Sequence, residues 1–329
     1  MIAFNFERPD SLSAAVQAYK PSSAFLAGGT TLVDLMKLDV MRPATLIDVN
    51  ASYNGEADIT LQGDVIRLDA GARMAQAESH PLVLANLPVV AQSLQLAASP
   101  QLRNMASLGG NVLQRTRCSY FRDVAFANCN KRNPGSGCAA LDGVNRMHAV
   151  LGASDACIAA YPGDFAQALV AMDASVDVVS ANGRRSLKFD QLHREPGEHP
   201  ELETTLKPGE LIEAFRIPTA SWTKRSLYLK IRDRQSYAFA LASAAVALDM
   251  EGDAIKGARI ALGGLATKPW RAHEAEARLV GKSASPEAFN AAAEAAFAEA
   301  KPRDGNRFKV ELGKRTLVRA LTQTAEMKV

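Results

Sequence analysis

The segment Phe25-Leu-Ala-Gly-Gly-Thr-Thr31 places two glycines between a predicted strand and a predicted helix. Backbone N–H groups and the dipole of the following helix can hold a phosphate group at such a turn. The hydroxyl groups of Thr30 and Thr31 add two further donors. A glycine pair there can also be no more than a tight connection. The turn fits neither the G-x-G-x-x-G fingerprint of Rossmann folds nor the P-loop pattern G-x-x-x-x-G-K-[ST].

A second glycine pair stands in the segment Leu102-Arg-Asn-Met-Ala-Ser-Leu-Gly-Gly-Asn-Val112, after an apolar helical run predicted for residues 82–98. A dinucleotide has a pyrophosphate with two negative centres, and two glycine loops suit it better than one loop does. The alternative is that both segments are simple turns. Together the two loops indicate a dinucleotide site between them.

The hydrophobic pattern around these loops predicts an α+β protein. Strands are expected at residues 2–6, 24–27, 46–49, 65–70, 156–160, 176–179 and 211–217, and helices at 11–19, 31–38 and 165–172. This alternation predicts two N-terminal α/β units, residues 1–55 and 56–220. Apolar strands at 227–231 and 258–262 are followed by Ala-rich helices at 286–300 and 310–322. They predict a separate C-terminal α+β domain, residues 221–329.

Composition excludes several classes of function. The 329 residues include 38 basic and 35 acidic side chains, and the two signs are interspersed along the chain. A nucleic-acid-binding protein would be expected to have a strongly basic region instead. The apolar stretch 238–248 is about half of the roughly 20 residues needed to span a bilayer. The first ten residues include Glu7 and Asp10, so we expect no secretory signal of the chain's own. Export is then expected only together with a partner.

All four cysteines lie in one stretch, which belongs to a long segment with little periodicity at about residues 114–160. They are Cys118, Cys129, Cys138 and Cys157. Structural disulfides are a poor expectation without a secretory signal. A loop of this length inside a compact domain is usually functional or disordered. The clustering therefore favours a metal or cluster site.

The motif A-G-G-T at residues 27–30, together with R-N-x-A-S-L-G-G-N at residues 103–111, resembles the FAD-binding subunit of molybdenum hydroxylases, the xanthine dehydrogenase and aldehyde oxidase family. The resemblance extends over the whole chain, including Pro208-Gly-Glu-Leu-Ile212 and Lys230-Ile-Arg-Asp-Arg-Gln-Ser-Tyr-Ala238. It implies two N-terminal subdomains that clasp FAD, similar to those of vanillyl-alcohol oxidase. It also implies a C-terminal domain of the carbon monoxide dehydrogenase flavoprotein type.

The resemblance also implies which residues bind FAD. The pyrophosphate and ribitol would lie against two sets of residues: Ala27, Gly28, Gly29, Thr30 and Thr31, and Ala106, Ser107, Gly109, Gly110 and Asn111. Asp164 would bind the ribose or adenine side, and Lys230 would approach the isoalloxazine. Many relatives have Asp or Glu in place of Thr31, which weakens any role for that position but leaves the glycine loop intact.

Only some members of this family have an insertion at the cysteines, chiefly the 4-hydroxybenzoyl-CoA reductase and periplasmic aldehyde oxidoreductase types. In both, the insertion binds a [4Fe–4S] cluster, and this chain looks closest to the aldehyde oxidoreductase version. Four thiolates complete such a cluster, and five basic residues could offset its charge: Arg115, Arg117, Arg122, Lys131 and Arg132. Zinc and unligated thiols remain alternatives, although ten, eight and eighteen intervening residues are unlike the short C-x₂₋₄-C knuckles of zinc sites.

The implied function is electron transfer. An aldehyde would be oxidised to a carboxylic acid at a molybdenum cofactor in a large partner subunit, and electrons would pass through [2Fe–2S] clusters of a small partner subunit to this FAD. The flavin would then reduce an external acceptor. The expected compartment is the periplasm, by co-export with a partner, with the cytoplasm as the alternative. Other candidate functions are a 4-hydroxybenzoyl-CoA reductase subunit, a freestanding flavin dehydrogenase and a zinc-stabilised assembly protein.

Overall fold

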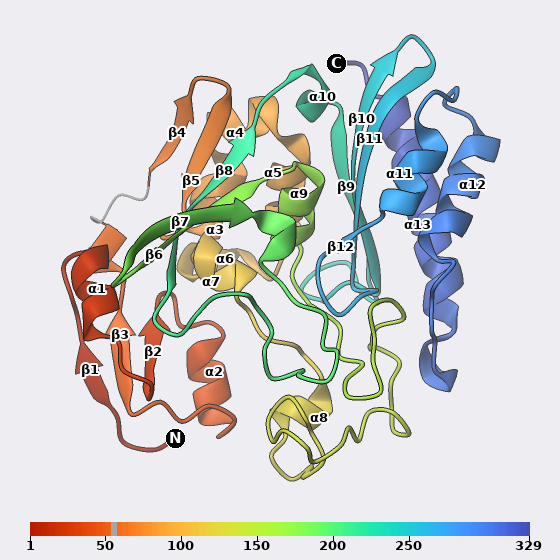
Figure 1. The fold of residues 1–329 in the computed structure, drawn as a ribbon. Coiled ribbons are helices and arrows are strands. Elements are labelled where there is room, and N and C mark those ends of the chain that lie inside the picture. Colours follow the sequence, from red (N-terminus) through yellow and green to blue (C-terminus); the bar gives the residue numbers. More distant parts are fainter. Residues whose placement is uncertain (54–57) are drawn as a thin grey trace.

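The computed structural model describes residues 1–53 and 58–329, which form three sheets with their helices (Figure 1). The N-terminal sheet consists of β1 (Asn5–Glu7), β3 (Thr45–Asp48) and β2 (Ser23–Leu26) in that order, and both neighbouring pairs are parallel. Helices α1 (Leu12–Ala18) and α2 (Leu32–Lys37) connect the strands. This is the α/β unit that the sequence predicted. Its predicted end at residue 55 lies outside the described residues.

The second sheet is antiparallel throughout and has the order β4-β5-β8-β6-β7. Its strands are β4 (Ile59–Gln62), β5 (Val65–Asp69), β6 (Ser175–Ser180), β7 (Gly183–Lys188) and β8 (Leu211–Pro218). Short turns join β4 to β5 and β6 to β7, and a turn this short can join only antiparallel strands. Alternation of strands and helices along the sequence therefore does not lead to parallel pairing here. The strand expected at residues 156–160 is absent from this described segment.

Several short helices cover this sheet, five before the cysteine segment and one after it. They are α3 (Met74–Ser79), α4 (Pro81–Asn86), α5 (Pro88–Gln95), α6 (Pro100–Met105), α7 (Leu108–Val112) and α9 (Phe165–Ala171). The single helical run predicted for residues 82–98 is wrong, because α4 ends at Asn86 and α5 starts at Pro88. Proline has no N–H to donate, and its ring disfavours helical backbone in the residue before it.

The C-terminal part is a four-stranded antiparallel sheet with helices on one face (Figure 1). After α10 (Ser221–Lys224) come β9 (Ser226–Ile231), β10 (Ala242–Glu251), β11 (Ala254–Gly263), β12 (Trp270–Arg271), α11 (His273–Leu279), α12 (Pro286–Ala296) and α13 (Phe308–Ala325). Strand β10 was not predicted. Its first seven residues are all buried, and such an uninterrupted apolar run has no alternation by which a strand could be recognised.

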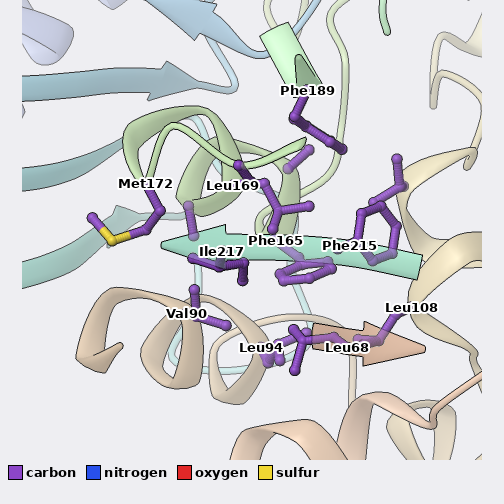
Figure 2. Close-up of a cluster of buried hydrophobic side chains, with 14 of the residues drawn as sticks. Leu68, Val90, Leu94, Leu108, Phe165, Leu169, Met172, Phe189, Phe215 and Ile217 are labelled. Carbon is purple, nitrogen blue, oxygen red and sulfur yellow. The ribbon is translucent and has the colours of Figure 1, made fainter. Parts of the chain in front are cut away.

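The largest hydrophobic core joins the second sheet to the C-terminal sheet through α5 and α9 (Figure 2). Phe165 of α9 is fully buried, and its ring centroid lies 5.6 Å from that of Phe215 on β8 in an edge-to-face arrangement. Leu68 and Val90 lie in the same cluster. Because this core continues from one sheet to the other, the two parts of the chain are held in a fixed relation.

The cysteine segment has little regular structure and lies below the other elements in the view of Figure 1. It contains the single-turn helix α8 (Ser119–Arg122), and short 3₁₀ turns occur elsewhere at Ala51–Tyr53, Phe189–Gln191 and Asp304–Asn306. Among the described residues, no helix has the length and apolar character required to cross a bilayer.

Phe165→Ala is expected to lower the free energy of unfolding by about 3–5 kcal/mol, because it removes a large buried ring and leaves a cavity. The matched control is Leu61→Ala, since Leu61 is 50% exposed and such surface changes usually stay within about 0.5 kcal/mol. Urea unfolding followed by circular dichroism measures both. Equal effects of the two substitutions would contradict the proposed position of this core.

Candidate functional site

The two glycine loops touch each other through their backbones. A Cβ atom on Gly28 would lie 1.9 Å from the carbonyl oxygen of Met105, so only glycine allows this approach. The guanidinium of Arg73 braces the contact by donating hydrogen bonds to the Met105 carbonyl at 2.6 Å and to Oδ1 of Asn50 at 2.8 Å. The Nδ2 of Asn50 in turn donates to the carbonyl of Ala27 at 3.1 Å. Arg73 and Asn50 were not predicted as site residues.

The loops line two adjoining hollows, which together we call the cleft. The first hollow is lined by residues 27–32 with Ser107, Gly109 and Gly110, and the second by Thr30, Thr31, Ala106, Asn111 and Asp164. The cleft therefore brings together all the predicted cofactor residues except Lys230. The residues that line the cleft lie far apart in the chain, and they come together where the loop after strand β2 meets helix α7.

The first glycine loop offers free donors to the cleft. In the part of the chain that the structure describes, no protein group accepts a hydrogen bond from the backbone N–H groups of residues 28–31. Gly29 has a φ of +71°, a left-handed backbone conformation that favours glycine. Helix α2 behind the loop has only six residues. The free N–H groups, more than a helix dipole, therefore make this loop suitable for an anion.

The second glycine loop differs from the first because three of its backbone N–H groups already have partners in the protein. Its N–H groups at Gly109, Gly110 and Asn111 already donate to the Ala70 carbonyl, Ser107 Oγ and the Ser107 carbonyl at 2.8, 3.1 and 2.8 Å. The prediction that this loop also presents free N–H groups is thus wrong for these three. It contributes close packing instead, since a Cβ on Gly109 would lie 3.0 Å from Ala70 Cβ. In the cleft, Oδ1 of Asn111 is buried without a hydrogen-bond partner.

Asp164 and Lys230 form a buried ion pair. Lys230 Nζ lies 2.7 Å from Asp164 Oδ2, and their side chains are 1% and 4% exposed respectively. The hydroxyl of Tyr228 donates to Asp164 Oδ1 at 2.7 Å, and burial raises the pKa of Tyr228 well above its usual value. The two side chains thus contact each other, and their predicted roles, Asp164 at the ribose or adenine side and Lys230 near the isoalloxazine, stay predictions. Asp164 faces the cleft, and Lys230 lies behind it.

The four cysteines line one small cavity. All are free thiols, and Cys129 and Cys138 oppose each other across a short antiparallel bridge. Burial raises the pKa of Cys118 to about 12 and that of Cys157 to about 11. Within residues 1–53 and 58–329, no three His, Cys, Asp or Glu side chains lie close enough together to hold a single metal ion.

The basic residues around the cysteines are mostly paired with other groups. Arg117 and Arg122 contact Asp34 at 3.3 and 2.8 Å. Arg115 and Lys131 contact the carboxylate of Glu203 at 2.5 and 2.9 Å, which holds the pKa of Glu203 below its usual value despite burial. Arg132 donates to backbone carbonyls. Of the five cations predicted to offset a cluster's charge, only Lys131 lines the cysteine cavity.

His148 also contacts the cysteine cavity, although it was left out of the predicted ligands. Its Nε2 lies 3.1 Å from Sγ of Cys118. Burial, together with the charge of Lys309, lowers the pKa of His148 to about 4, so the ring is neutral at pH 7. A lone histidine in an irregular segment gives no sequence signal for such a contact, and only the folded chain brings the two residues together.

Sequence models of two known families match the chain. The FAD binding domain in molybdopterin dehydrogenase matches residues 2–220, and the CO dehydrogenase flavoprotein C-terminal domain matches residues 227–325. The matched regions contain both glycine loops, the cysteine segment and the Asp164–Lys230 pair. The first match alone extends over more than half of the 329 residues.

Similar proteins support this assignment. The chain is 43% identical over 326 residues to the aldehyde oxidoreductase FAD-binding subunit PaoB of Escherichia coli, covering 98% of each chain. It is 25% identical to the glyceraldehyde dehydrogenase medium chain of Sulfolobus acidocaldarius, covering 85% of this chain and 82% of the relative. The solved carbon monoxide dehydrogenase of Hydrogenophaga pseudoflava superimposes with a TM-score of 0.75 at 27% identity, covering 98% of this chain and 97% of that one. The chain therefore belongs to the FAD-binding medium subunits of the molybdenum hydroxylases.

Proposed function

We propose that this chain is the electron-transfer subunit of a molybdenum-dependent aldehyde oxidoreductase and carries both FAD and a [4Fe–4S] cluster. The observation that carries the proposal is the set of four free thiols around one cavity, next to a cleft built for a dinucleotide. The 43% identity to a subunit named for aldehyde oxidoreductase supports the substrate class.

The cleft residues fit FAD. The free N–H groups of residues 28–31 can donate to the pyrophosphate, and Gly28 allows the close approach of the Met105 carbonyl that joins the two loops. The unpartnered Oδ1 of Asn111 can accept from a ribitol or ring donor. When bound, FAD supplies the exchange between two-electron and one-electron transfer. The Asp164–Lys230 pair would fix the polarity of one wall of the cleft.

The cysteine segment suits an iron–sulfur cluster better than zinc, because its ten, eight and eighteen intervening residues are unlike the short C-x₂₋₄-C knuckles of zinc sites. A cluster needs four thiolates around a volume, whereas a structural zinc ion needs four ligands that converge on one point. Burial raises the pKa values of Cys118 and Cys157, and a bound metal would favour their deprotonated thiolate forms. Lys131, the cation in the cavity wall, would offset part of the charge that the thiolates gain.

The two proposed cofactor sites are neighbours. Cys118 lines a further hollow together with Arg117, Pro162 and Phe239, and these last three also line the FAD cleft. The wall between cluster and flavin would therefore be formed by a few side chains, and a short separation favours electron exchange. We further propose that a large molybdenum-cofactor subunit oxidises the aldehyde to a carboxylic acid. Its electrons would arrive through [2Fe–2S] clusters of a small subunit, and an external acceptor would remove them.

Gly28→Ala should reduce FAD retention at least about tenfold, which corresponds to 1.4 kcal/mol of lost affinity, because its methyl group would collide with the Met105 carbonyl. Gly257→Ala is the matched control, since its methyl group would make only ordinary contacts at 3.5 Å or more. Flavin absorbance per polypeptide after gel filtration measures both. If Gly28→Ala retains FAD as well as the control does, the glycine loop is not the binding site.

Cys138→Ala should remove most of the iron and acid-labile sulfide while leaving FAD in place, because a cubane cluster needs all four thiolates. Val144→Ala is the control in the same segment, since Val144 is 79% exposed. The measurement is iron, sulfide and flavin analysis of protein purified without air. Roughly four irons per chain in the control and few in the variant are expected. Zinc in place of iron in the control would refute the cluster.

A further inference from the structure

We infer that His148 donates a hydrogen bond to the sulfur of Cys118 and thereby raises the reduction potential of the cluster. The inference rests on the proposed function, because it takes the four cysteines as the ligands of that cluster. It assigns a role to a residue that would not itself bind iron. The role is carried by the 3.1 Å contact between His148 Nε2 and Cys118 Sγ.

The position of the proton on the ring follows from its surroundings. His148 is 4% exposed, and a thiolate that binds iron has no proton of its own, so a hydrogen bond between Nε2 and Cys118 Sγ must be donated by the ring. Its other nitrogen, Nδ1, is buried with no hydrogen-bond partner. A proton on Nδ1 would leave a buried donor unsatisfied, which costs more than leaving an acceptor bare. The proton therefore belongs on Nε2, which faces the sulfur.

Side chains of the C-terminal part hold His148 in this place by hydrogen bonds to the His148 backbone and its neighbours. Lys309 of α13 is fully buried, and its ammonium donates to the carbonyls of His148, Met147 and Gly264 at 3.0, 3.3 and 2.5 Å. Asn306, also fully buried, donates to the carbonyls of His148 and Ala149 at 3.3 and 3.2 Å. Among the described residues no carboxylate forms an ion pair with Lys309. In the described part of the chain the Lys309 side chain hydrogen-bonds to backbone carbonyls alone, so Lys309 is a positioning residue.

The hydrogen bond acts on a cysteine that also lines a hollow beside the flavin cleft. Of the four cysteines, which all lie in the described part of the chain, Cys118 is the one that also lines the hollow between the cluster cavity and the cleft. His148 lines the same hollow. The contact between His148 and Cys118 therefore lies in a hollow that adjoins the cleft.

The effect on the potential has a definite sign. A cluster that takes up one electron gains negative charge, which is shared by its cysteine sulfurs, and an N–H donor stabilises the more negative form. No bond is made or broken in this step, and the proton stays on Nε2. Removing the donor should therefore make the cluster harder to reduce.

The test is His148→Phe, which keeps a planar ring but has no N–H group. The purified complex with its partner subunits is titrated with dithionite, and the cluster's midpoint potential is read from its electron paramagnetic resonance signal. We expect a lower potential than in the wild type, with unchanged iron and FAD content. His148→Gln, which restores an N–H donor, should recover part of the shift. His273→Phe, at a 68% exposed side chain of α11, should leave the potential unchanged.

An unchanged potential in His148→Phe with a full iron content would overturn the inference while leaving the cluster in place. If His148→Phe loses its iron, Lys309→Met decides, because it displaces the backbone of His148 without altering a side chain at the sulfur. It should lower the potential in the same direction, and no change would refute the hydrogen bond. A wild type without iron would refute the proposed function itself, which the iron analysis distinguishes from either result.

Discussion

The close approach of Gly28 to the carbonyl of Met105 is the constraint on which the cofactor cleft depends. This contact joins the loop after strand β2 of the parallel N-terminal sheet to the end of helix α6, which covers the antiparallel sheet. It therefore fixes the position of one unit relative to the other. Arg73 holds both sides of this contact through Asn50 and the Met105 carbonyl. Any side chain at Gly28 would separate the two loops and widen the cleft. The first glycine loop thus presents its free N–H groups to the cleft, and the second glycine loop forms the opposite wall of the cleft.

The cysteine segment is held by polar anchors rather than by regular structure. A segment without helix or sheet must satisfy its backbone groups in other ways, and here Arg132, Asn306 and Lys309 donate to its carbonyls. Two of these anchors come from the far end of the chain, so the C-terminal part supports the cysteines as well as covering its own sheet. The Glu203 carboxylate, which lies outside the segment, also anchors it by ion pairs with Arg115 and Lys131. The cavity is therefore fixed from several directions before any metal arrives.

Some of this arrangement could be predicted from the sequence because the signals were local. Paired glycines after a short strand marked the loop at Gly28, and the uneven spacing of cysteines marked their segment. Other features depend on tertiary contacts that the sequence does not show: Lys230 pairs with Asp164, and most basic residues near the cysteines pair with carboxylates. Strand β10 escaped prediction because it is buried on both faces. His148 and Arg73 needed the folded chain to reveal their partners.

The central claim is that one chain holds a flavin in the cleft and an iron–sulfur cluster among its four cysteines. The most direct test is a crystal structure of the protein purified without air, with anomalous scattering recorded on both sides of the iron absorption edge. The account predicts one strong iron peak enclosed by Cys118, Cys129, Cys138 and Cys157, and flavin density across the loops of Gly28 and Ser107. A cavity containing zinc, disulfides or no metal, or a cleft without flavin in the fully loaded complex, would contradict it.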